Sequence, residues 1–171
     1  MFHTKRLFSR FCYLEYEWWS FMKALVLVLL IPCILVNSVY AASQEQKTEQ
    51  AAIDAAIAEK LVNYDPIQTA SINDMDMIVG ITDTSRFGLE AALRAIASCL
   101  VDYFVSTDID PDDYGLYGAT YVIYLGETMS DGSFYKVANS KVFSPHVAEA
   151  VKNGGTLAAK RTLGDRMIGE L

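Results

Sequence analysis

The chain has 171 residues, a net charge of −7 and three cysteines. This length allows one small domain with a single core and excludes two separate cores. The negative charge argues against nucleic acid and anionic lipid surfaces as partners, because both repel an acidic protein.

Residues 22–41 have the three parts of a secretory signal. A Met-Lys start supplies positive charge, residues 24–36 are apolar apart from one proline, and a short polar segment follows. Val39 and Ala41 occupy the two small-residue positions that precede a signal-peptidase cut. We therefore expect cleavage between Ala41 and Ala42, and a mature protein that is periplasmic or secreted.

Two other interpretations of this segment stay open. The apolar stretch from Phe21 to Val36 would be a marginal, tilted membrane anchor, because a span needs roughly twenty residues. The residues Leu30–Cys33 loosely resemble a lipidation motif, but Pro32 fits poorly before the cysteine and the chain stays apolar after it. We favour the cleaved signal, which leaves no membrane span in the mature protein.

Residues 1–21 precede the signal and show no clean helical stripe. We interpret them as an upstream extension that results from too early a start, with Met22 as the true first residue. Two Trp codons followed by an AG-type codon for Ser20 would spell a ribosome-binding sequence just before Met22. Residues 42–171 then form a single exported domain.

Loss of residues 1–41 makes the remaining domain more acidic. That segment carries four basic and two acidic residues, so residues 42–171 have a net charge near −9. Such a charge favours a cationic protein or a neutral glycan as partner, although it also keeps a small exported protein soluble.

Cys99 is the one cysteine of residues 42–171, so no intramolecular disulfide can form there. It falls at helical spacing among Leu93, Ile96 and Leu100, a pattern that favours a buried thiol. The alternative is an exposed thiol that links two copies of the chain into a homodimer.

Hydrophobic periodicity and turn residues predict the element order α-β-α-β-β-α-α. We infer an α+β fold, in which helices pack a small mixed or antiparallel sheet of about three strands. The expected elements are a helix over 46–62, a strand over 75–81, a helix over 87–104, strands over 117–125 and 134–143, a short helix from Pro145, and a helix over 157–170.

Local signals set several of these boundaries. An oxygen of the Thr82–Ser85 cluster should cap the second helix. Ser144 should cap the helix that has Pro145 in its first position, and the glycines of residues 152–155 should end it. The strand over 117–125 is apolar on both alternating faces, which predicts a central strand covered on both sides.

The most unusual feature is an aromatic and acidic concentration within residues 102–124. Tyrosine is enriched at contact sites, and neighbouring carboxylates favour a basic partner. We therefore expect a binding surface for a basic protein partner here, unless these tyrosines are core residues and the acids a solvated loop. The predicted site residues are Asp108, Asp110, Asp112, Asp113, Tyr114 and Tyr117.

No metal or other cofactor is predicted. Asp108, Asp110 and Asp112 alternate as in the first half of an EF-hand loop, which needs glycine at its sixth position and glutamate at its twelfth. Asp113 and Ala119 hold those positions, so that motif is broken. A looser calcium site on the same carboxylates is the alternative.

Catalytic motifs are missing from residues 42–171, where His146 is the one histidine. We therefore expect a small exported protein without enzymatic activity that binds another macromolecule, such as an envelope-complex accessory or an inhibitor of a cationic enzyme. One alternative is a small-ligand or glycan-binding domain that uses the same tyrosines. The other is a hydrolase with an unrecognised site around His146 or Cys99.

N-terminal sequencing of the exported protein should give a chain that begins at Ala42, because the cut follows the small residues Val39 and Ala41. A membrane-extracted protein that keeps residues 22–41 would contradict the cleaved signal. A lipid on Cys33 would establish the lipoprotein alternative instead.

Overall fold

The computed structural model describes residues 44, 46–73, 75–107, 109–111 and 120–171. Contacts between Cα atoms divide the chain into residues 1–47 and residues 48–171, and the second unit holds the sheet and the hydrophobic core. None of the helices in the described part combines the length and hydropathy that a membrane span requires.

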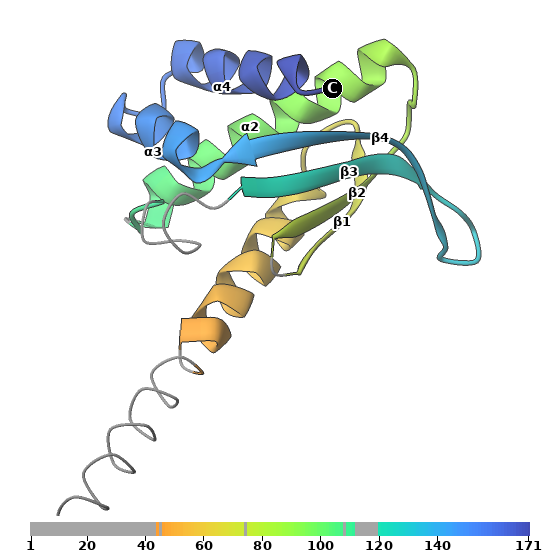
Figure 1. Cartoon of the computed structure of the whole chain (residues 1–171), viewed down its shortest axis with the longest axis horizontal. Helices are drawn as coiled ribbons and strands as arrows, with labels where there is room; N and C mark the ends of the chain where they lie inside the picture. The colour runs from red at the N-terminus through yellow and green to blue at the C-terminus, as the bar shows by residue number, and fades with distance from the viewer. Residues whose placement is uncertain (1–43, 45, 74, 108, 112–119) are drawn as a thin grey trace, which may run out of the picture. The chain divides into compact units, whose positions relative to one another are not determined.

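The second unit is an α+β domain built on four strands (Figure 1). The strands lie in the order β1-β2-β3-β4, with β2 parallel to β3 and the two outer pairs antiparallel. The mixed sheet confirms the predicted fold class, with four strands rather than about three. The elements are an N-terminal helix (residues 46–61), β1 (Ile67–Asn73), β2 (Asp76–Ile81), α2 (Arg86–Thr107), β3 (Thr120–Thr128), β4 (Phe134–Phe143), α3 (Ser144–Lys152) and α4 (Leu157–Gly169).

Strand β1 was absent from the sequence prediction. Its sequence, IQTASIN, has one fully buried side chain, Ile67, while Ala70 and Ile72 are half-buried. An edge strand pairs on one side only and shows weak hydrophobic alternation. The antiparallel partner β2, which begins three residues after β1 ends, decides its conformation.

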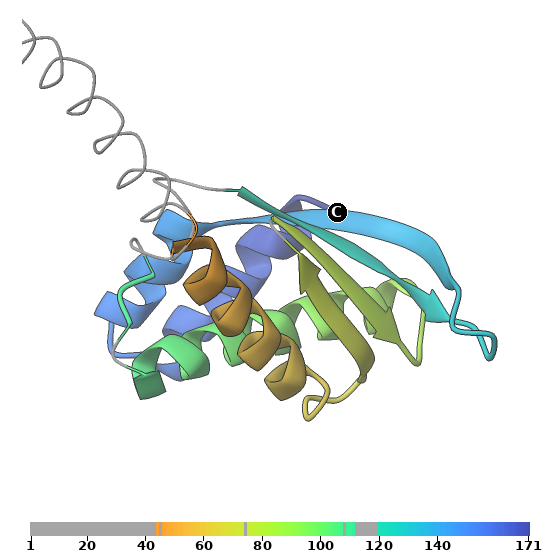
Figure 2. The same ribbon diagram turned by 90° about the horizontal axis from the view of Figure 1, so that it is seen from below.

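The helices lie on one face of the sheet (Figure 2). On β3, Ile123 and Leu125 point toward the helices and are fully buried, whereas Val122 and Tyr124 alternate with them and stay half-buried. On β2, Ile78 belongs to this second face and is 40% exposed. The predicted strand over 117–125 corresponds to β3, which lies inside the sheet as expected of a central strand. Its predicted cover on both sides is wrong among the described residues, because no described helix packs on the second face.

The core lies between the sheet and α2. Eleven residues of α2 are buried, and several are small, so neighbouring elements can approach closely. Gly164 of α4 is one such contact, since a Cβ there would lie 3.1 Å from Arg94 Cγ and 3.7 Å from Ala97 Cβ. The fully buried large side chains are Phe104, Ile57, Leu61, Met77, Ile81, Leu93, Ile96, Ile123, Leu125, Met167, Val79 and Val101.

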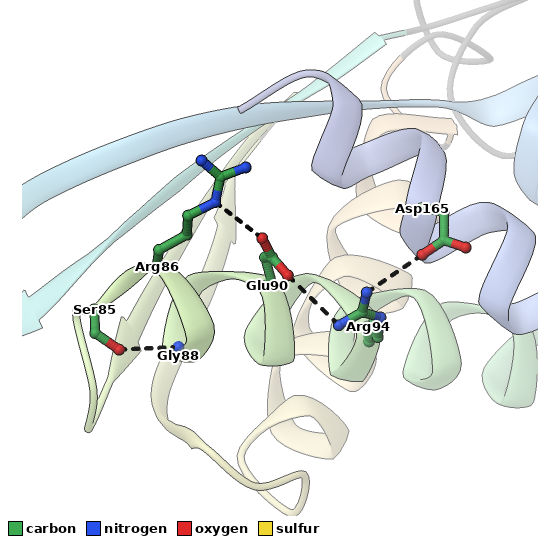
Figure 3. Close-up of polar contacts among 6 residues, drawn as sticks. All are labelled: Ser85, Arg86, Gly88, Glu90, Arg94 and Asp165. Carbon is green, nitrogen blue, oxygen red and sulfur yellow. Dashed lines mark hydrogen bonds and ion pairs between the residues drawn. The ribbon is translucent and has the colours of Figure 1, made fainter.

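A chain of charged side chains runs from the start of α2 to α4 (Figure 3). Glu90 accepts from Arg86 Nε at 3.1 Å and pairs with Arg94 at 3.9 Å, and Arg94 reaches Asp165 of α4 at 3.4 Å. Most of these side chains are largely exposed, so the network orients α4 on α2 but adds little stability.

The helix boundaries test the capping predictions. Ser85 Oγ accepts from Gly88 N at 3.3 Å, which confirms a cap from the Thr82–Ser85 cluster (Figure 3). Gly154 and Gly155 have φ of 73° and 60° after α3 ends, as expected of glycine terminators. The prediction for Ser144 is wrong: Phe143 is the N-cap residue, and no side chain caps α3.

Gly88→Ala should lower the free energy of unfolding by about 1–3 kcal/mol, although alanine is the better helix former. An added Cβ would collide with the Asp83 backbone carbonyl, which folds back over the first turn of α2. Gly169→Ala is the matched control, since nothing lies within 4 Å of its Cβ position. Urea denaturation of both variants measures the difference, and equal stabilities would refute this tight contact.

Candidate functional site

One of the predicted site residues, Asp110, lies in the described part of the chain, where it is exposed. The others, Asp108, Asp112, Asp113, Tyr114 and Tyr117, lie outside the described residues. The structure therefore describes the residues that flank residues 112–119, namely those that follow α2 and those that begin β3.

The chain is fixed to the core just before residues 112–119. The hydroxyls of Ser106 and Thr107 both donate to the Tyr103 carbonyl, at 2.8 and 2.9 Å, and close the last turn of α2. Ile109 packs half-buried against the core, and Pro111 is buried. The exposed Asp110 thus sits between two apolar anchors, and β3 starts at Thr120.

Charge is distributed unevenly along the chain. Residues 42–133 carry 16 acidic and 4 basic side chains, whereas residues 134–171 carry 3 acidic and 6 basic ones. The net charges are thus −12 and +3. The basic part comprises β4, α3 and α4, so the acidic character predicted for the whole domain belongs to its other elements.

The thiol of Cys99 is fully buried on α2. Burial raises the pKa of Cys99 to about 12, although Lys60 nearby acts in the opposite direction. A thiol with this pKa is a poor nucleophile. This placement agrees with the predicted buried position, and a disulfide to another copy would require α2 to leave the core.

A polar cluster joins the turn after the N-terminal helix to α2 and α4. Asp102 accepts hydrogen bonds from Tyr64 Oη at 3.1 Å and from Lys160 Nζ at 2.5 Å. Burial, and then the hydrogen bond to Asp102, raise the pKa of Tyr64 to about 12. The Asp102 carboxylate accepts bonds from a cation and a hydroxyl. We therefore interpret this cluster as a structural contact between helices rather than a reactive site.

His146 lines two surface hollows between α3, α4 and the end of β4. The larger hollow has a volume of about 400 Å³ and the smaller about 200 Å³. The two share His146, Leu163 and Arg166. The His146 ring also packs edge-on against Phe143, with ring centroids 5.3 Å apart.

An ion pair crosses between the helices at this point. Arg166 Nη1 of α4 donates to Glu149 Oε2 of α3 at 2.7 Å. This bond and the charge of Arg166 lower the pKa of Glu149, and the nearby His146 acts in the same direction. The ion pair joins α3 to α4, and Arg166 is one of the residues that line both hollows.

A much smaller void of about 10 Å³ lies under β3 and α3. Its lining is apolar except for Tyr121 and Ser144, and the buried Ser144 Oγ has no hydrogen-bond partner among the described residues. A void of this size holds about one water molecule, so it is a packing defect rather than a ligand site.

No group of three His, Cys, Asp or Glu side chains that could hold a metal ion occurs within the described ranges. The alternating carboxylates of residues 108–112 fall partly outside those ranges, so the calcium alternative stays a prediction.

Comparisons of the chain with protein-family models, curated proteins and solved structures found no match. The functional assignment therefore depends on the residues and geometry described above.

The sequence reasoning singled out His146 but missed the two cations beside it. Lys141 and Arg166 line the larger hollow, yet Arg166 lies twenty positions after His146 and belongs to another helix. No short motif links these residues. The excess of basic residues after position 134 was the one available signal.

Cys99 should react with a thiol reagent at pH 8 roughly a hundredfold or more slowly in the native protein than in urea. The native thiol is both buried and almost fully protonated, because its pKa is about 12. Absorbance of the released chromophore follows the reaction. Similar native and unfolded rates would mean that α2 is not packed as described.

Proposed function

We propose that the domain of residues 42–171 is an exported protein without enzymatic activity that binds a macromolecule with a basic surface. The contact is made by the acidic, tyrosine-rich segment of residues 108–117, in the periplasm or outside the cell. An envelope-complex accessory and an inhibitor of a cationic enzyme both fit this description.

The anchoring of Ile109 and Pro111 is the observation that best supports this proposal. Both side chains are tied to the core on either side of the exposed Asp110. A binding segment whose base is fixed loses less conformational entropy on association than one on a free tail. The acidic side chains of the segment can then contribute to the affinity of the complex as well as to the rate of association.

The charge distribution supports a partner with a basic surface. Residues 42–133 have a net charge of −12, and the acids of residues 108–113 lie within that part. A field of one sign steers a basic partner and raises the association rate, with a strong dependence on ionic strength.

A small-ligand function is the second candidate, and the hollows at His146 favour it. A hydrolase has less support. Cys99 and Ser144 are buried, and the one hydroxyl that lines the smaller hollow, Thr162, already donates to the Ala158 carbonyl at 3.0 Å. The smaller hollow contains the imidazole of His146 and the carboxylate of Glu149, but none of the described residues places a nucleophile beside them.

The double variant Asp112→Lys, Asp113→Lys should capture its partner from an envelope extract at least about tenfold less well than the native protein, because each change places a cation against a basic surface. The Glu49→Lys, Glu59→Lys double variant carries the same charge change on the N-terminal helix and should retain capture. Quantitative mass spectrometry of the co-purified proteins is the measurement.

Unchanged capture by the first variant would contradict the proposed segment. Equal loss in both variants would show that total charge alone attracts the partner. A thermal-shift screen separates the second candidate, since a small ligand that binds the native state raises its melting temperature.

A further inference from the structure

The two hollows beside His146 are parts of one groove. The groove runs between α3 and α4 and reaches the end of β4, where Figure 1 shows these three elements together. Arg166 lines both hollows, and its bond partner Glu149 lines the smaller one. The guanidinium therefore borders both hollows while its position is held from the α3 side.

The larger hollow is more basic than the protein as a whole. Its charged lining consists of Lys141 at the end of β4, Arg166 of α4, and Glu170 after the last turn of α4. His146 adds an imidazole that can donate a hydrogen bond. Arg166 also pairs with Glu149 of the smaller hollow, so two cations meet two carboxylates and the site is locally neutral within a domain whose net charge is near −9. Lys141, His146 and the further N–H groups of Arg166 are the hydrogen-bond donors that the site offers to an anionic ligand.

The rest of the lining is apolar. Val142, Leu163 and Met167 underlie the hollow but are only 1–2% exposed. The half-buried Phe143, whose ring packs against His146, is the apolar side chain of the lining that a ligand can reach. With about 400 Å³, the hollow falls within the usual range of ligand pockets, about 300–1,000 Å³. This lining suits a ligand that has an apolar body and an anionic group.

We propose that this hollow binds a small organic carboxylate with an apolar or aromatic body. Arg166 and Lys141 bind the carboxylate, and the apolar body lies against the ring of Phe143. Arginine suits this role because its planar guanidinium presents several N–H donors in fixed directions, so Glu149 and a ligand can be bound at once.

Glu149 acts in this arrangement as a positioning residue. Its bond to Arg166 at 2.7 Å limits the rotamers of a long side chain that is 41% exposed, so less side-chain entropy is lost when a ligand binds. The hollow lies on the basic part of the chain and is independent of the acidic segment proposed to bind a macromolecule.

The test is a titration of the full mature protein with 4-phenylbutyrate, followed by ¹H–¹⁵N correlation spectra at neutral pH. Saturable shifts are expected at amides of residues 141–146 and 163–170. The uncharged 4-phenylbutanamide is the matched control and should bind at least about tenfold more weakly, because it lacks the charge-assisted hydrogen bonds. Inorganic phosphate should also bind more weakly, because it lacks the apolar body.

Three single variants of the charged lining should change the affinity for 4-phenylbutyrate, two by weakening it and one by strengthening it. Arg166→Gln and Lys141→Gln should each weaken 4-phenylbutyrate binding, Arg166→Gln by about tenfold. Glu170→Gln removes the opposing carboxylate from the lining and should strengthen binding. Arg161→Gln, an exposed cation of α4 outside the lining, is the charge-matched control and should leave the affinity unchanged.

Equal binding of the acid and the amide would overturn the proposal, as would equal losses in Arg161→Gln and Arg166→Gln. Shifts confined to other elements would place the probe elsewhere and also overturn it. Phosphate binding as tight as that of 4-phenylbutyrate would show a site that recognises charge alone. The charged side chains at issue lie at the surface, and unchanged spectra of the free variants establish that they fold.

Discussion

The burial of α2 is the constraint on which the rest of the domain depends. This 22-residue helix contributes eleven buried residues and contacts the sheet, α3 and α4. Its Asp102 also bonds to Tyr64, in the turn after the N-terminal helix. No disulfide can form within residues 42–171, so apolar burial must offset the conformational entropy of folding. Small residues, such as Ala97 on α2 and Gly164 on α4, let the backbones of these two helices approach closely. Because this packing holds the helices together, the network of charged side chains between them can contribute little stability.

The two proposed binding regions lie next to the ends of α2 and β4 in the chain. The segment after Pro111 follows the carboxyl end of α2 and precedes β3, and the groove at His146 lies where β4 passes into α3 and α4. These two regions carry opposite charge: the first belongs to the acidic part of the chain and the second to the basic part. The two proposals accordingly assign a basic macromolecule to the first region and a small anion to the second.

Most elements were predictable, because strong hydrophobic periodicity and glycine or proline signals specify local structure. The bounds of β4 agree with the prediction, and α2, α3 and α4 differ by a few residues at their ends. The misses share one physical cause. Strand β1, the uncovered faces of Val122 and Tyr124, and the uncapped start of α3 at Ser144 all depend on which element lies alongside, and a local pattern does not contain that information. The same holds for the groove, where the lone His146 was visible but its neighbours Lys141 and Arg166 were not.

The sequence by itself determined the acidic character of the domain, the absence of an internal cross-link, the α+β class and the helical, buried environment of Cys99. These follow from composition and from periodicities that act over a few residues. Only the tertiary structure decided that the described strands form a four-stranded sheet with the described helices on one face, that Asp102 joins Tyr64 to Lys160, and that Arg166 meets Glu149 near His146. Such contacts join positions far apart in the chain, and their geometry is fixed by the packing of helices around α2 rather than by any local preference.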